Sequence, residues 1–167
     1  SGCLEPFLRR TATEGDWFHE ELWTAGLPPS LAEGAEFIIP FESAINFVSR
    51  SARRLKAEEF GLQVGATTSI RSLPKLGSVV GTSTTLLEAI TAIVEALSSI
   101  TNVRRVWLDI GLKTARLNHS SPVIRFAGEE HAEQFALMLL INLVREVAGE
   151  DWSPDHVTVS QSAFDLV

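Results

Sequence analysis

Residues 129–159 read EEHAEQFALMLLINLVREVAGEDWSPDHVTV, and this stretch decides the fold class of the chain. Glu129 and Glu130 suit the N-terminal end of a helix dipole, Arg145 suits the C-terminal end, and Gly149 fits a C-cap. The apolar residues between them recur at steps of three and four, as on one face of an α-helix: Ala132, Phe135, Ala136, Leu139, Leu140, Leu143 and Val147. We therefore predict a long amphipathic helix with a defined beginning and end, followed by a turn.

Two further helices are predicted near the start of the chain. Aromatic and apolar residues between residues 16 and 23 are compatible with a short helix, which the Gly-Leu-Pro-Pro sequence at residues 26–29 ends. Pro40 can occupy the first turn of the next helix, and apolar residues then recur at helical spacing as far as Leu55. Both helices offer an apolar side to a common core.

A capping box marks the start of another helix. The sequence Thr-Leu-Leu-Glu at residues 85–88 allows the threonine hydroxyl and the glutamate carboxylate to bind backbone amides reciprocally, which predicts a helix over residues 86–98. The preceding residues 61–81 are rich in Gly, Ser and Thr, and Pro74 opposes one continuous helix there. We expect an ordered connection containing short helical turns.

The hydrophobic period changes from helical to two beyond Asn102. Three apolar residues, Val106, Leu108 and Ile110, alternate with Arg105, Trp107 and Asp109, which is typical of a strand. Further strand candidates lie at residues 114–117, 123–126 and 156–160. The pattern predicts an α+β fold with helices packed on an antiparallel sheet of about four strands.

Length and composition indicate one folded domain. The chain has 167 residues, 45% of them hydrophobic and 21% charged, which suits a single globular domain spanning residues 1–167. Residues 1–15 are expected to form a flexible or artificial arm. The net charge of −7 opposes direct DNA binding, because affinity for phosphates rests on clustered Lys and Arg. The absence of a long apolar run or leader pattern predicts a cytoplasmic location without membrane contact.

The end of the chain and several short anchors before it resemble one protein family. The anchors follow a consistent order: Ala25-Gly26-Leu27-Pro28, Ile39-Pro40-Phe41, Phe60-Gly61-Leu62 with Gly65, Leu76-Gly77 and Thr85-Leu86-Leu87-Glu88-Ala89. Together with the helix, turn and strand pattern of residues 129–159, they resemble the N-terminal sensor domain of AraC/XylS-type bacterial transcription regulators. The resemblance covers about residues 17 to 160.

This resemblance implies a regulatory function. Such a domain would bind an unknown small-molecule effector, form a homodimer and act on DNA through a C-terminal helix-turn-helix domain. Residues 1–167 contain no basic recognition helix, so DNA binding is expected to belong to a domain absent from this sequence. The helical content departs from the cupin-like barrel of the arabinose regulator, so neither that fold nor arabinose is carried over.

The sequence offers no recognisable catalytic or metal-binding arrangement. It has no Gly-x-Ser-x-Gly elbow, and its four histidines form no compact ligand motif. Cys3 is the one cysteine, which rules out an internal disulfide. His131 is interpreted as a surface or hydrogen-bonded residue. We predict neither an enzyme nor a cofactor.

Four residues are candidates for effector binding. Trp107 offers a flat surface and Arg105 a fixed charge on one face of the first strand, while Arg116 and His119 could contribute from the next strand. The alternative is that Trp107 belongs to the core or a dimer interface and that both arginines are solvated. A second basic group, Arg50, Arg53, Arg54 and Lys56, is interpreted as a solvated helix face rather than a phosphate or nucleic-acid contact.

Two functions from different classes follow. The first is an effector-sensing domain that controls dimer state or DNA binding by changing its conformational equilibrium. The second is a protein–protein interaction or dimerisation module without a small-molecule ligand, which exposed apolar surface would favour.

Overall fold

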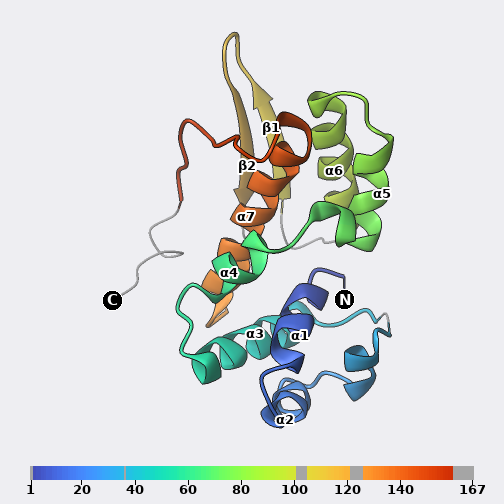
Figure 1. The fold of residues 1–167 in the computed structure, drawn as a ribbon, viewed down its shortest axis with the longest axis vertical. Coiled ribbons are helices and arrows are strands. Elements are labelled where there is room, and N and C mark those ends of the chain that lie inside the picture. The colour runs from blue at the N-terminus through green and yellow to red at the C-terminus, as the bar shows by residue number, and fades with distance from the viewer. Residues whose placement is uncertain (1, 36, 101–104, 121–125, 160–167) are drawn as a thin grey trace. The chain divides into compact units, whose positions relative to one another are not determined.

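The computed structural model describes residues 2–35, 37–100, 105–120 and 126–159, which form seven α-helices, two 3-10 helices and one β-hairpin (Figure 1). The chain divides into two compact units. The first comprises Ser1–Thr68, Arg125–Met138 and Val157–Val167, and the second comprises Ser69–Ile124 and Leu139–His156. Helix α7, Glu129–Ala148, supplies residues to both units, and the single domain stays a prediction.

The first unit is helical, and aromatic side chains occupy its core. Its elements are α1 (Glu5–Ala12), α2 (Trp17–Thr24), η1 (Pro29–Glu33), α3 (Phe41–Leu55) and α4 (Phe60–Ala66). The ring of Phe7 lies 5.5 Å from that of Phe60 and 4.8 Å from that of Phe135, while Phe18 and Phe47 are 6.1 Å apart. Such tilted and edge-on pairs are the favoured aromatic geometries. Helices α2 and α3 confirm the two helices predicted in this part of the chain.

The structure describes a helix within residues 1–15, the stretch that was expected to form a flexible or artificial arm. Residues 5–12 form α1, in which Phe7, Leu8 and Thr11 are buried. The Thr11 hydroxyl donates to the Phe7 carbonyl at 2.8 Å, so its burial leaves no unsatisfied donor. The apolar residues at this end were too few to reveal a helical period, but Phe7 completes the aromatic core.

Helices α4 and α7 approach closely because α4 carries two glycines one turn apart. A Cβ on Gly61 would lie 1.9 Å from the His131 carbonyl oxygen, and one on Gly65 would lie 2.6 Å from the Met138 Cβ. Buried Gln134 fixes the contact, because its Oε1 accepts from the Gly61 amide at 3.2 Å and its Nε2 donates to the Glu58 carbonyl at 3.3 Å. The glycines quoted in the sequence resemblance thus have a packing function.

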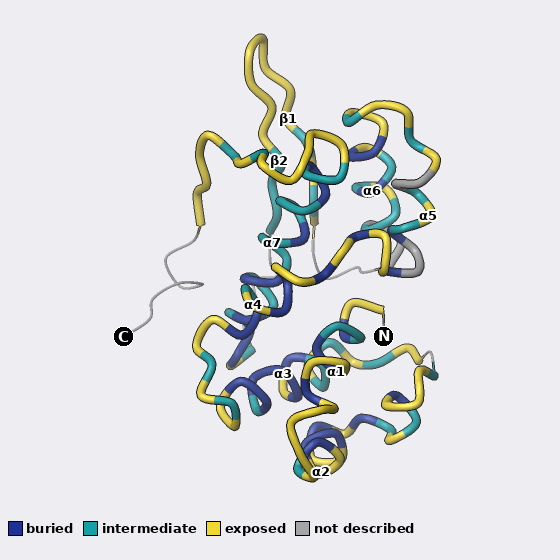
Figure 2. The backbone as a smooth tube through the Cα atoms, in the orientation of Figure 1, coloured by how far each residue is buried: buried dark blue, intermediate teal, exposed yellow. Residues whose placement is uncertain are grey.

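The second unit combines helices with the hairpin. Its elements are η2 (Ile70–Ser72), α5 (Pro74–Thr82), α6 (Leu86–Ile100), β1 (Arg105–Ile110) and β2 (Ala115–Ser120). As predicted, no continuous helix runs through residues 61–81, because α4, η2 and α5 are separate elements. Pro74 begins α5, where a first-turn residue has no intrahelical use for its N–H. Figure 2 shows buried backbone along parts of α6 and α7, where Ile93 and Leu143 are each 1% exposed.

Among the residues that the structure describes, the sheet has two antiparallel strands rather than the predicted four or so. The hairpin of β1 and β2 confirms the first two candidates. The candidate at residues 123–126 lies outside the described residues except for Phe126, which is not in a strand. The fourth strand is wrong over its described part, residues 156–159, where the chain forms no strand and Val157 and Val159 are exposed. Two alternating valines fit a strand but specify no partner.

The capping box at the start of α6 is formed as predicted. The Glu88 amide donates to the Thr85 hydroxyl at 3.2 Å, and the Glu88 carboxylate accepts from the Thr84 amide at 2.9 Å and the Thr85 amide at 3.2 Å. The hydrogen bonds from Thr84, with a smaller one from Thr85, hold the pKa of Glu88 below its ordinary value.

Replacing Thr85 with alanine should therefore lower the free energy of unfolding by about 1 kcal/mol, because the first turn of α6 loses a capping acceptor. Thr91→Ala is the matched control, since Thr91 is exposed within the same helix and alanine favours helices. Urea unfolding of both variants measures the effect. Equal stability of the two variants would show that the cap contributes nothing.

Candidate functional site

The β1–β2 register decides which predicted effector residues share a surface. Arg105 pairs with Ser120, Trp107 with Asn118 and Asp109 with Arg116, so all six side chains belong to one face of the hairpin. Figure 2 shows that most of this hairpin is exposed, and Trp107 itself is 42% exposed. We call Arg105, Trp107, Asp109 and Arg116 the tryptophan face.

The structure brings three of the four predicted residues together. Arg105 lies two positions from Trp107 on the same strand, and Arg116 lies diagonally across from Trp107 on β2. His119 pairs with Val106, so it belongs to the opposite face of the hairpin. Whether any of the four binds an effector stays a prediction.

The tryptophan face combines an aromatic ring with charges of both signs. Asn118 donates from Nδ2 to Asp109 Oδ2 at 2.9 Å, and Asp109 lies directly across from Arg116. Arg105 and Arg116 therefore leave this face with a net positive charge in a chain whose net charge is −7. A planar molecule bearing a carboxylate or phosphate could stack on the indole and pair with a guanidinium.

A shallow groove of about 350 Å³ lies in the second unit, along the start of α6. Five of its seven lining residues are polar, although apolar atoms form most of the lining surface: Thr82, Ser83, Leu87, Glu88, Thr91, Ala92 and Glu95. The Glu88 carboxylate is already engaged by the helix cap, and the Thr82 and Ser83 hydroxyls both donate to the Val79 carbonyl at 3.0 Å. Glu95 can still orient a ligand, and these two hydroxyls can still accept a hydrogen bond from one. Hydroxyl and carboxylate groups suit a polyol or a cation better than an anion.

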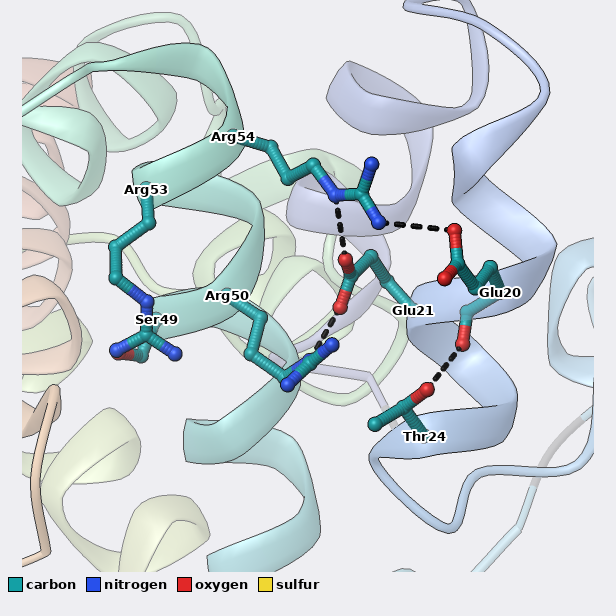
Figure 3. A network of polar contacts seen from close by, with 7 residues as sticks. All are labelled: Glu20, Glu21, Thr24, Ser49, Arg50, Arg53 and Arg54. Carbon is teal, nitrogen blue, oxygen red and sulfur yellow. Dashed lines mark hydrogen bonds and ion pairs between the residues drawn. The ribbon is translucent and has the colours of Figure 1, made fainter.

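The basic group on α3 is an ion-pair network, which differs from the predicted solvated face (Figure 3). Arg50 donates from Nε to Glu21, and Arg54 donates from Nε to the other Glu21 oxygen at 2.7 Å and from Nη2 to Glu20 at 2.8 Å. Arg53 donates to the Ser49 hydroxyl at 3.1 Å. The arginines at residues 50 and 54 therefore hold α3 against α2.

Glu21 is the residue that sequence reasoning missed. Its side chain is 2% exposed, and it shares the buried side of α2 with Phe18 and Leu22. Burial alone would raise the pKa of Glu21, but hydrogen bonds and charges from Arg50 and Arg54 outweigh burial and lower the pKa. The sequence signal was the position of Glu21 within the apolar stripe of a helix, three residues after Phe18 and four after Trp17. A carboxylate buried in such a stripe requires a cationic partner.

His131 is buried and hydrogen-bonded. Its ring lies 6.3 Å from that of Phe60, and Nδ1 is 3.4 Å from Gln134 Oε1. Burial lowers the pKa of His131, so the neutral imidazole is favoured near pH 7. Among the described residues, no group of three or more His, Cys, Asp and Glu could hold a metal ion.

Comparison with known proteins gives one family match. A family model described as the N-terminal arabinose-binding domain of AraC transcription regulators matches residues 19–164. The match begins within α2, extends beyond α7 and includes both strands that carry the tryptophan face. No curated protein sequence matches the chain. Within the described residues, no helix has both the length and the apolar character needed to cross a membrane.

Proposed function

Because this chain belongs to the family of N-terminal arabinose-binding domains of AraC transcription regulators, we propose that it binds a small-molecule effector and thereby controls DNA binding by another domain of the regulator. The match over residues 19–164 is the observation that carries this proposal. A homodimer is part of the same proposal. A cytoplasmic location is part of it too, since a transcription regulator acts where the DNA is.

The tryptophan face is the effector surface that we propose. It provides an exposed ring with two guanidinium groups near it, which is a set of groups suited to a planar anion such as an aromatic or sugar carboxylate. The groove along α6 is the second candidate, and its hydroxyl groups and Glu95 favour a neutral polyol or a cation. The two candidates therefore differ in the ligand charge that they prefer.

An effector acts on such a domain through differential binding. It shifts the domain toward whichever conformation or dimer state it binds more tightly, and the shift is limited by that difference in affinity. No bond of the effector needs to break. Reversible binding without turnover is thus the expected behaviour.

A thermal-shift screen tests the proposal. The panel should contain neutral sugars, sugar acids, aromatic carboxylates and polyamines, with each compound recovered afterwards and checked for chemical change. An effector present at about a hundred times its Kd should raise the Tm by about 5 °C, because ligand binding adds to the stability of the folded state. Chemical conversion of the bound compound would contradict a purely regulatory function.

Trp107→Ala should weaken binding of a screened anionic effector by about three- to tenfold, because the ligand loses its stacking surface. Trp23→Ala is the matched control, since Trp23 is an exposed tryptophan on α2 in the other unit. Isothermal titration calorimetry measures both affinities. An equal affinity of the Trp107 variant and wild type would remove the tryptophan face as the effector surface and leave the groove along α6.

The alternative function is a protein-interaction module without a small-molecule ligand. The hairpin favours it in one respect, because Ile110 is 67% exposed and Leu112 in the connecting loop is fully exposed. Exposed apolar side chains of this size are typical of protein contacts. This alternative predicts that no compound in the panel changes the Tm while the domain still associates with a protein partner.

A further inference from the structure

The end of the β1–β2 hairpin, residues 110–115, projects from the second unit, and we call it the hairpin tip. Leu112 is fully exposed there, and Lys113 beside it is exposed as well. The Gly111 amide donates to the Thr114 carbonyl at 2.8 Å, which closes the loop that carries both side chains. Figure 1 shows that the hairpin tip extends past helices α5 and α6 of the same unit. An apolar side chain held out in this way is suited to a contact with another molecule.

The hairpin is the basic part of an acidic chain. Residues 105–120 contain three basic side chains and one acidic one, Asp109, which gives the hairpin a net charge of +2. Because the whole chain has a net charge of −7, the remainder carries −9. Opposite charge therefore attracts the hairpin of one copy to the remainder of another copy.

The groove along α6 has the complementary character. Leu87, which is 52% exposed, and Ala92 offer apolar side chains, while Glu95 and Glu88 supply negative charge. The Glu88 carboxylate accepts its three capping hydrogen bonds from neutral donors, so its charge stays in place. A volume of about 350 Å³ is small for a ligand site and suits one or two inserted side chains.

The hairpin tip does not fill the groove of its own chain, because Leu112 is fully exposed. Figure 1 shows the hairpin tip and the connection between α5 and α6 at the same end of the second unit. Two copies that meet at this end can therefore exchange tips about a two-fold axis. Each copy then gives one tip and receives one, so the exchange is closed at two copies.

We propose that a second copy of this chain inserts its hairpin tip into the groove along α6, and that two copies exchange tips in this way to form a homodimer. Leu112 packs against Leu87 and Ala92, and the Lys113 ammonium group pairs with the Glu95 carboxylate. Two contacts of this size bury less area than a standard stable interface, so we expect a Kd on the order of 10 µM.

This interface deepens the dimer part of the proposed function and rests on it. The hairpin that ends in the tip also carries the tryptophan face, so an effector bound there touches the strands that hold the tip. The experiment below measures association without any effector, so its failure would leave effector binding by the monomer unaffected.

The test uses two single variants of the full chain, Lys113→Glu and Glu95→Lys. Each variant places like charges together at both contacts of its own homodimer, so the Kd of self-association should rise about tenfold. General repulsion between copies cannot explain both effects, because the first variant makes the net charge more negative and the second makes it less negative. Both positions are exposed, so neither substitution should disturb the fold.

An equimolar mixture of the two variants should regain the wild-type affinity. In the mixed dimer the substituted tip meets the substituted groove with opposite charges, and the wild-type tip meets the wild-type groove. Native mass spectrometry identifies this heterodimer when one of the variants is uniformly labelled with ¹⁵N, and sedimentation velocity measures the Kd.

Leu112→Ser removes the apolar part of both contacts and should raise the Kd by at least about tenfold. Lys56→Glu is the matched control for Lys113→Glu, because it changes the net charge equally but lies at an exposed position after α3, in the first unit. Its association should equal that of wild type. The proposal would be overturned by a wild-type chain that is monomeric at about ten times the expected Kd, by wild-type association of Lys113→Glu or Glu95→Lys, or by a mixture that stays dissociated.

Discussion

Replacing Gly61 with alanine should lower the free energy of unfolding by about 3 kcal/mol, because the packed helices leave no room for the added methyl group. The added Cβ would lie 1.9 Å from the His131 carbonyl oxygen, 2.7 Å from its carbonyl carbon and 2.8 Å from the Gln134 Cβ. These are backbone atoms and a helix-bound Cβ, so no flexible side-chain end can move aside. Helices α4 and α7 must separate, and the Gln134 hydrogen bonds to Gly61 and Glu58 are then lost.

Gln63→Ala is the control for Gly61→Ala. Gln63 is exposed on the same helix, α4, and alanine has a favourable helix propensity at either position. Urea unfolding should show a change within about 0.5 kcal/mol for this variant. If the Gly61→Ala variant were as stable as the Gln63→Ala variant, the result would contradict the close contact between α4 and α7 at Gly61.

Glu21→Gln should lower the free energy of unfolding by about 2 kcal/mol at neutral pH, because a neutral amide replaces the carboxylate that accepts charged hydrogen bonds from Arg50 and Arg54. The substitution preserves side-chain volume, so the loss reports charge rather than packing. Arg50 and Arg54 are both partly exposed and can reach water, which limits the cost. Glu20→Gln is the control, because the Glu20 pair with Arg54 is exposed and should contribute little.

The contribution of Glu21 should depend on pH in a defined direction. Its pKa is lower in the folded state than the ordinary value, so the ion pairs stabilise the fold fully above the unfolded pKa of about 4.3. The stabilisation is then lost as the pH falls through the lower folded pKa. The stability difference between wild type and Glu21→Gln should shrink over that acidic range. A difference that stays constant with pH would show that Glu21 contributes through shape alone.

Periodicity and capping predicted most helices, because those signals are local. The apolar steps of residues 129–147, the Gly149 C-cap and the Thr85–Glu88 capping box all appear in α7 and α6, and Gly149 has a φ of +100°. The role of Gly61 was not visible in the same way. A glycine within a helix is locally unfavourable, and only the approach of α7 explains it.

The sheet and the candidate site were predicted less well because they depend on pairing. Residues 156–159 have a strand-like alternation, but pairing requires a partner edge that local sequence does not specify. The grouping of His119 with Arg116 overlooked a local rule, since residues three apart on a strand lie on opposite faces. The Glu21 network joins Glu21 to arginines that lie 29 and 33 positions away in sequence, so local sequence made these arginines look merely solvated.

Native mass spectrometry of the purified chain, with each compound that raises its Tm, tests the sensing function most directly. The account predicts a complex whose added mass equals that of the intact compound, and dilution or exchange should release that compound unchanged. A chain that retains no compound from the panel, in either its monomeric or its dimeric form, would contradict effector sensing. Release of a chemically altered compound would contradict it as well and indicate an enzyme.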